Sequence, residues 1–265
     1  MKNTIYVLFV VGVMGLLGQS EVHAQSDTWK SPDEDILKIV HATKLPRTSI
    51  SPARTHMLLS APIIYPSLSE MGAPMLKLAG TRVNPKNNYY HGRHGGTSPR
   101  ILTIKDGKTT KLNIPAGAEV MSTSWTADGQ RFALSVGFED RIELWLGDIT
   151  GKVEKVPNVV LNPLMDLAAQ WFPDQQRLLI RNIAKRGAAP QKPTMPKGPK
   201  ILEDAGASAR STYEARNLLI TAHDDDLFTH YTQCELVVYD SKTKKMQTVG
   251  PTASYRSATI SPLVP

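Results

Sequence analysis

The sequence is poor in cysteine, with Cys234 alone among 265 residues. An internal disulfide is therefore excluded, and without a second thiol there is no cysteine-based zinc site and no redox pair. Cys234 precedes a strand-like run and is interpreted as a small buried apolar residue. Aromatic residues are also scarce, at 6%. None is interleaved with the basic residues of the Pro-rich stretch 185–200, so that stretch lacks the stacking groups of a nucleic-acid surface.

The sequence also lacks an apolar run long enough to span a membrane. The longest, Ile5–Leu17, has 13 residues, whereas a spanning helix needs about 20. Lys2 places a positive charge before this run, and Val22–Ala24 supplies short residues where a leader peptidase cleaves. We predict a signal peptide over residues 1–24, cleaved after Ala24, and a periplasmic or secreted protein with no membrane contact after cleavage. An uncleaved N-terminal anchor is the alternative.

Charge and composition indicate a folded globular chain. Lys and Arg number 31 against 24 Asp and Glu, which gives +7, and 41% of residues are hydrophobic. Disorder would require fewer apolar residues and a larger charge imbalance. The 18 Gly and 19 Pro are enough to separate many short elements. The positive charge is spread along the chain, which favours solvation or an anionic partner surface over nucleic acid.

Helical periodicity is almost absent. One short helix is predicted after Ser31, which is interpreted as its N-cap, with Pro32 as the first helical residue. Elsewhere short apolar runs alternate with turn residues, a pattern typical of an antiparallel all-β domain. The predicted strands are Met57–Ile64, Ile101–Ile104, Arg131–Val136, Ile142–Ile149, Leu178–Ile183, Leu218–Ala222 and Glu235–Tyr239.

A weak internal repeat lies within this pattern. The segments Ser51–Leu58, Thr126–Ala133 and Phe172–Leu179 each resemble a tight turn entering an apolar strand, and a Trp precedes the last two. A fourth copy begins at Ile260. A Trp, a turn and two hairpins in about 40 to 50 residues is the pattern of a β-propeller blade. The sequence therefore predicts an all-β fold, a partial and open β-propeller of about three to four blades.

Two long insertions, Ser67–Thr97 and Gly187–Asp226, account for the uneven spacing of the copies. The predicted organisation is a signal peptide over 1–24, an N-terminal extension with the short helix over 25–48, and an incomplete propeller over 49–265.

Both insertions resemble a known family. The segments concerned are Met75–Asn88, Pro190–Ile201, Tyr213–Leu219 and Asp224–Tyr231. Together they resemble the glutamyl endopeptidase branch of the prolyl oligopeptidase (S9) family of serine peptidases, over about residues 29–262. In that family an N-terminal propeller caps a C-terminal α/β-hydrolase domain, which holds the catalytic Ser, acid and His. The resemblance thus implies peptide substrates and a serine-type peptidase as the enzyme class.

No catalytic residue of that family has a counterpart in this sequence. The Gly-x-Ser-x-Gly elbow that holds the nucleophile is absent, and the nearest segment, Gly206–Arg210, lacks the second Gly. We therefore predict a non-catalytic propeller fragment of a secreted peptidase, truncated before the hydrolase domain whose access it would gate. The alternatives are a periplasmic propeller that acts as a binding module without enzymatic activity, and an independent hydrolase.

Three polar groups remain as candidate sites. His91–Gly96 could form a metal nest or an oxyanion loop, but without a nucleophile a flexible solvated loop is favoured. His223–Asp226, with His230, lacks the Gly and the distal Glu of a calcium loop and is interpreted as a charged surface turn. No metal and no cofactor are predicted.

Arg82 and Arg93 are the candidate substrate-channel residues, since guanidinium groups attract acidic side chains. Their alternative role is that of surface arginines or of arginines that bridge blades. The open edges of an incomplete propeller also predict self-association.

Overall fold

A computed structural model describes residues 31–183, 186–192, 218–219 and 221–261 of the chain. The predicted signal peptide and the segment Gly206–Arg210 lie outside these residues. The chain divides into one unit that ends at Thr43 and a second that begins at Lys44. In its described part, the first unit contains helix α2 (Glu34–Val40). The side chain of Asp33 accepts a hydrogen bond from the backbone N–H of Asp35, so the N-cap is Asp33 and not Ser31.

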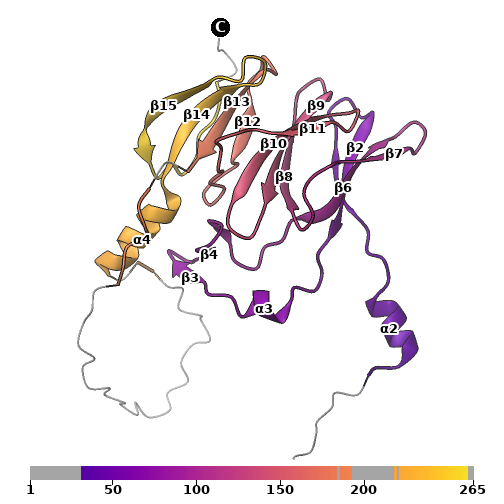
Figure 1. Ribbon diagram of the computed structural model, residues 1–265, viewed down its shortest axis with the longest axis horizontal. Helices are drawn as coiled ribbons and strands as arrows, with labels where there is room; N and C mark the ends of the chain where they lie inside the picture. The colour runs from indigo at the N-terminus through magenta and orange to yellow at the C-terminus, as the bar shows by residue number, and fades with distance from the viewer. Residues whose placement is uncertain (1–30, 184–185, 193–217, 220, 262–265) are drawn as a thin grey trace, which may run out of the picture. The chain divides into compact units, whose positions relative to one another are not determined.

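The described part of the second unit contains an eight-stranded, a four-stranded and a three-stranded antiparallel sheet (Figure 1). We call the two four-stranded halves of the eight-stranded sheet blades 1 and 2, and the four-stranded sheet blade 3. Blade 1 contains β1 (Arg47–Ile50), β2 (His56–Pro62), β6 (Gly96–Thr103) and β7 (Thr109–Lys111). Blade 2 contains β8 (Glu119–Trp125), β9 (Arg131–Gly137), β10 (Ile142–Asp148) and β11 (Val153–Lys155). Blade 3 contains β12 (Ala169–Trp171), β13 (Arg177–Asn182), β14 (Cys234–Asp240) and β15 (Met246–Ala253).

In each blade the strands pair in chain order, and a single residue pair, Gly96 with Val120, joins blades 1 and 2. The predicted fold class is confirmed: the chain is all-β, and it forms a partial, open β-propeller. Of the predicted fourth copy, Ile260 and Ser261 are described and lie in no strand.

The turns confirm the internal repeat. In each copy the fourth turn residue donates its backbone N–H to the carbonyl of the first, at 2.8–2.9 Å. This fourth residue is Arg54, Gly129 or Gln175, and its φ is 57°, 67° or 58° respectively. Positive φ suits glycine best, because a Cβ crowds the backbone in that region. The three copies thus share one backbone conformation although only the middle copy contains the favourable residue.

Two tryptophans connect successive blades. Trp125 Nε1 in blade 2 donates to Ser49 Oγ in blade 1 at 2.9 Å, and Trp171 Nε1 in blade 3 donates to the Ser124 carbonyl in blade 2 at 3.0 Å. Each indole therefore crosses from the first strand of one blade to the first strand of the preceding blade. This explains why a Trp precedes the turn in the second and third copies.

Replacing Trp171 by phenylalanine should lower the free energy of unfolding by about 1–3 kcal/mol, because the Ser124 carbonyl loses its indole donor. Trp125→Phe should have a similar effect. Urea unfolding measures both, with Tyr65→Phe as the control because Tyr65 is exposed. Equal stability of all three variants would show that the indole N–H groups do not hold the blades together.

Two of the three buried apolar clusters among the described residues lie between the blades. Phe132, Leu134 and Val136 of β9 pack with Leu58 and Ile101 of blade 1. Between blades 2 and 3 the buried residues are Ala133, Ile142, Leu144, Val156, Val159, Leu161, Ala168, Ala169, Leu178, Ile180, Val237 and Tyr239. Strand β9 is buried on both faces, which is the position of a strand in the middle of a stack of sheets.

The insertions contain elements that the sequence analysis did not predict. The first holds α3 (Leu68–Met71) and the small sheet β3 (Leu76–Leu78), β4 (Thr81–Asn84) and β5 (Tyr89–Tyr90). The predicted strand Leu218–Ala222 is wrong, because helix α4 (Ala222–Thr232) begins at its last residue. Thr221 and Asp224 form a capping box, in which each side chain accepts the backbone N–H of the other.

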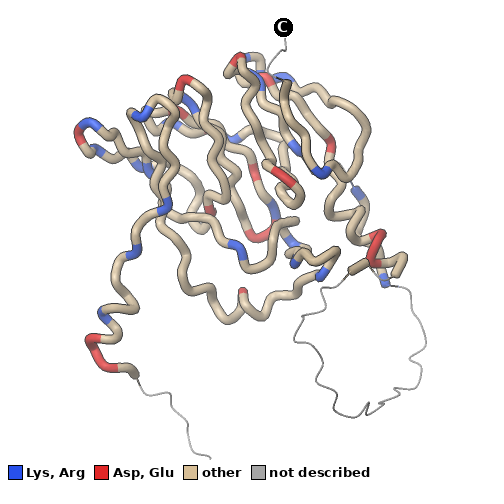
Figure 2. Tube along the Cα trace, turned by 180° about the vertical axis from the view of Figure 1, so that it is seen from behind, with Lys and Arg blue, Asp and Glu red and all other residues tan. Residues whose placement is uncertain are grey.

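His223–Asp226 is consequently the first part of a helix and not a surface turn. In the described ranges, no group of three or more His, Cys, Asp or Glu side chains is placed to hold a metal ion. No helix among those same residues has the length and apolarity to cross a membrane. Basic and acidic residues are distributed over the whole described trace, as Figure 2 shows.

Candidate functional site

The segment His91–Gly96 leads into blade 1, and two of its three glycines, Gly95 and Gly96, are tightly packed. Both are buried, and Gly95 N–H donates to a Glu119 carboxylate oxygen at 2.7 Å. A Cβ on Gly95 would lie 2.6 Å from the Val120 carbonyl oxygen, and one on Gly96 would lie 2.0 Å from Ser60 Oγ. The prediction of a flexible solvated loop is therefore wrong for Gly95 and Gly96. Gly95 is required by the close approach of blade 2, and Gly96 by the close approach of the neighbouring strand β2 in blade 1.

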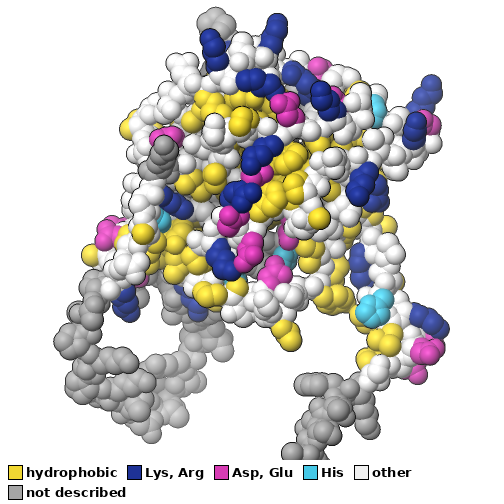
Figure 3. Space-filling view, in the orientation of Figure 1, with side chains coloured by type: hydrophobic (Ala, Val, Ile, Leu, Met, Phe, Trp, Pro, Cys, Tyr) yellow, Lys and Arg dark blue, Asp and Glu magenta, His cyan; other side chains and the backbone are white. Residues whose placement is uncertain are grey.

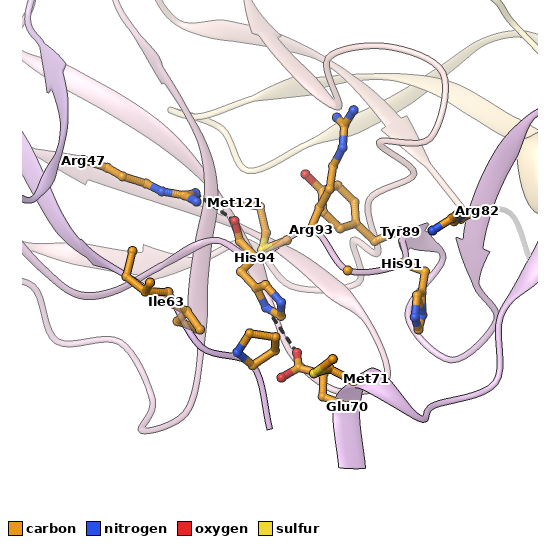
Figure 4. A pocket seen from close by; sticks show the side chains of 13 residues that line it. Arg47, Ile63, Glu70, Met71, Arg82, Tyr89, His91, Arg93, His94 and Met121 are labelled. Atoms are coloured by element: carbon orange, nitrogen blue, oxygen red, sulfur yellow. Dashed lines mark hydrogen bonds and ion pairs between the residues drawn. The ribbon is translucent and has the colours of Figure 1, made fainter. Parts of the chain in front are cut away.

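A cleft of about 790 Å³ lies beside this segment (Figure 4). The two predicted channel residues, Arg82 on β4 and Arg93, both line it. The structure thus brings together two arginines that the sequence separates by the β4–β5 hairpin. A third arginine, Arg47 on β1, lines the same cleft and was not predicted.

The cleft carries excess positive charge. Arg47 Nη1 donates to the His94 carbonyl at 2.8 Å, and the Arg93 guanidinium lies over the Tyr90 ring, 4.4 Å from its centroid. Glu70 supplies the carboxylate among the lining residues, and its Oε1 lies 3.1 Å from His94 Nδ1. Three arginines and one glutamate therefore line the cleft, and the glutamate carboxylate is paired with a histidine.

Tyr89 adds a phenol to this cleft. Burial raises the pKa of Tyr89, although the positive charges of Arg93 and Arg47 lower it, and the net direction is upward. The hydroxyl therefore stays protonated at neutral pH, where it can both donate and accept a hydrogen bond.

An ionic cluster around Glu143 of β10, whose side chain is buried, lies apart from the cleft. Glu143 has a side chain that is only 2% exposed, and it accepts hydrogen bonds from Arg141 Nε at 2.7 Å, Lys155 Nζ at 2.6 Å and Trp145 Nε1 at 3.1 Å. Burial alone would raise the pKa of Glu143. The three hydrogen bonds lower this pKa by more than burial raises it, so the pKa of Glu143 lies below its ordinary value. Figure 3 shows charged side chains of both signs between apolar patches on one face.

This cluster predicts an acid-sensitive contribution to stability. A carboxyl whose pKa is depressed by folding stabilises the fold above its unfolded pKa, about 4.3, and that contribution is lost as pH falls through the folded pKa. The difference in unfolding free energy between the native chain and Glu143→Gln should therefore be largest at neutral pH. It should shrink as the pH falls below the unfolded pKa of about 4.3. Urea unfolding at several pH values measures it, with the exposed Glu139→Gln as control. A difference that does not change with pH would contradict the assignment.

Three antiparallel blades stacked in an open arc define the chain as part of a β-propeller. No protein-family model matches the sequence. The chain is 30% identical over 251 residues to a probable chloroplastic glutamyl endopeptidase of Oryza sativa subsp. japonica. This alignment covers 88% of this chain and 26% of the rice protein. It is 29% identical over 244 residues to a probable chloroplastic glutamyl endopeptidase of Arabidopsis thaliana. That alignment covers 86% of this chain and 25% of the Arabidopsis protein.

The resemblance to the glutamyl endopeptidase branch of the prolyl oligopeptidase family of serine peptidases is thus confirmed over most of the chain. The chain spans about a quarter of the length of these two plant relatives. Among solved structures, the β-propeller domain of the trilobed protease from Pyrococcus furiosus, described as having an open velcro topology, matches with 12% identity and a TM-score of 0.36. That match covers 78% of this chain and 44% of the other.

Proposed function

We propose that this chain is the propeller portion of a secreted serine peptidase of the prolyl oligopeptidase family, and that it restricts the access of peptides to an α/β-hydrolase domain. The observation that carries the proposal is the similarity to two glutamyl endopeptidases over 88% and 86% of the chain. The blade architecture supports it, since stacked sheets of this kind enclose a central passage when the ring is complete.

The propeller portion is proposed to be non-catalytic. Acyl transfer by a serine peptidase needs a nucleophile that an adjacent base activates, and the elbow that presents such a serine is absent from all 265 residues. The proposed location, periplasmic or extracellular, rests on the leader-like residues 1–24. Arg82 and Arg93, in this proposal, attract acidic side chains of the peptide.

We expect purified residues 25–265 to show no hydrolysis of glutamyl or prolyl peptides or of an activated ester. A fluorophosphonate probe, which labels activated serines, provides the direct measurement, and a serine peptidase with an intact triad provides the positive control. Labelling of this chain would contradict the non-catalytic role.

The gating role is tested in a full-length relative such as the rice protein. A propeller that restricts access should allow cleavage of short or unfolded peptides and prevent cleavage of a native globular protein. Equal rates on the two substrates would count against gating.

The alternative is a propeller that binds a ligand without any associated hydrolase, and the cleft beside His91–Gly96 is the observation that favours it. The DNA downstream of Pro265 distinguishes the two proposals. A continuing reading frame that encodes a Gly-x-Ser-x-Gly elbow supports the peptidase, and a frame without one supports the binding module.

A further inference from the structure

A third buried apolar cluster contains side chains from β3, β4 and α4. Its buried members are Leu78 and Val83 of the small sheet, Leu227 and Tyr231 of α4, and Leu164 from the segment between β11 and β12. In Figure 1, α4 accordingly lies beside β3 and β4. Among the described residues, no member of this cluster belongs to a blade strand. The two insertions thus share a small core of their own.

A polar junction links the same elements at the C-terminal end of α4. The last carbonyl groups of a helix have no partner within the helix. Asn88 Nδ2, in the turn between β4 and β5, donates to the Tyr231 carbonyl at 3.0 Å. Asn162 Nδ2 donates to the same carbonyl at 3.0 Å and to the Gln233 carbonyl at 2.9 Å. Side chains from two distant segments therefore cap this helix end.

The side chains of the junction also bind one another. Asn88 and Asn162 are 2% and 0% exposed, and Asn88 Nδ2 donates to Asn162 Oδ1 at 2.9 Å. Arg186 Nη2 donates to Asn88 Oδ1 at 2.7 Å, and Arg186 Nη1 donates to the His230 carbonyl of α4. Removing one of these side chains leaves buried polar groups without partners, so the junction is weakened as a whole.

Neither the sheet nor the helix has the size to be stable alone. Strands β3, β4 and β5 contain three, four and two residues, and so small a sheet needs a surface to pack against. Helix α4 has 11 residues, and isolated helices shorter than about 12–15 residues are marginal in water. Each element therefore depends on the other for its burial.

We propose that α4 and the sheet β3–β5 form one cooperative unit, distinct from the blades, and that α4 holds the β4–β5 wall of the cleft in place. This hairpin carries Arg82 and Tyr89, which line the cleft, and Asn88 lies in its turn. Elements that share one small core open together, at a lower free energy than a larger core. Release of α4 therefore frees the cleft wall while the blades stay folded. The inference concerns the fold of this chain alone and is independent of the proposed peptidase role.

Hydrogen–deuterium exchange of the full chain, followed by mass spectrometry, tests this coupling. Thr221→Ala removes the N-cap of α4, at the end of the helix opposite to the junction. We expect exchange to become roughly fivefold faster in α4 and, by the same factor, in residues 76–90, with exchange in β9 and β10 unchanged. Asp33→Ala is the matched control, because it removes the N-cap of α2 and should leave residues 76–90 unchanged.

Asn162→Ala acts at the junction itself and should accelerate exchange in the same two segments by roughly tenfold or more. Asn113→Ala, which removes an exposed asparagine side chain, is its control. Trypsin provides a second readout, because a protease cleaves a chain that has opened locally. Cleavage after Arg82 should be faster in Thr221→Ala and Asn162→Ala, and unchanged in both controls.

Three results would overturn the inference. Faster exchange in α4 alone would show that the helix and the sheet open independently. Equal acceleration in α4, the sheet and the blades would show that no separate unit exists. Native exchange in residues 76–90 of both Thr221→Ala and Asn162→Ala would show that α4 does not hold the cleft wall.

Discussion

Phe132→Ala should lower the free energy of unfolding by about 3–5 kcal/mol, a large part of the stability of an ordinary domain. The ring is fully buried between blades 1 and 2. It lies edge-on to Trp125, with centroids 5.0 Å apart, and occupies the space above Gly147, where a Cβ would lie 2.5 Å from the ring. Removing it leaves a cavity at the centre of the interface between the blades.

Urea denaturation followed by tryptophan fluorescence measures this loss. Phe132→Leu is the matched variant, which retains most of the apolar volume and should lose substantially less. Tyr65→Ala removes an exposed aromatic ring and should have little effect. A Phe132→Ala variant as stable as the native chain would show that the blades do not depend on this interface.

The purified chain should self-associate. Cross-strand neighbours Ile50, Met57 and Leu102 form an apolar row on the face of blade 1 that points away from blade 2, and Ile50 is 53% exposed. On blade 3, Leu236 pairs with Val249, which is 44% exposed. Blades in a complete ring cover such faces with their neighbours, and uncovered apolar faces with free strand edges favour association.

Size-exclusion chromatography should show oligomers or aggregates of the native chain, with a broad thermal transition in calorimetry. Ile50→Lys/Val249→Lys places charges on both open faces and should shift the population toward the monomer. Thr243→Lys, in the exposed turn after β14, is the control and should leave the proportion of monomer unchanged. A monodisperse native monomer with one sharp transition would contradict the prediction.

Most of the fold was predictable because turns and strand periodicity are local properties of the sequence. The turn beginning at Thr126 and the strand Arg131–Gly137 follow from an Asp-Gly pair and a run of apolar residues. Helix α4 was missed because its residues have little amphipathic pattern, and the predicted strand overlapped its start. The capping box at Thr221 and Asp224 was the signal that identifies it, since it pairs two polar residues three positions apart.

The candidate site was predictable only in part. Arg82 and Arg93 were identified through their insertion, and the structure places both in one cleft. Arg47 was not predicted. It reaches the cleft because β1 pairs with β2, and its local sequence does not reveal that pairing. The same long-range packing explains Gly95, where the Val120 carbonyl of blade 2 leaves no room for a side chain.

The tryptophan contacts between blades have one direction along the chain. Trp125 donates to Ser49 and Trp171 donates to Ser124, so each donor belongs to a later segment than its acceptor. A blade that emerges from the ribosome therefore meets an acceptor that has already been synthesised. Since domains generally fold from the N-terminus during translation, blade stacking is expected to follow the order of synthesis, and each new blade covers the apolar face left open by the one before it.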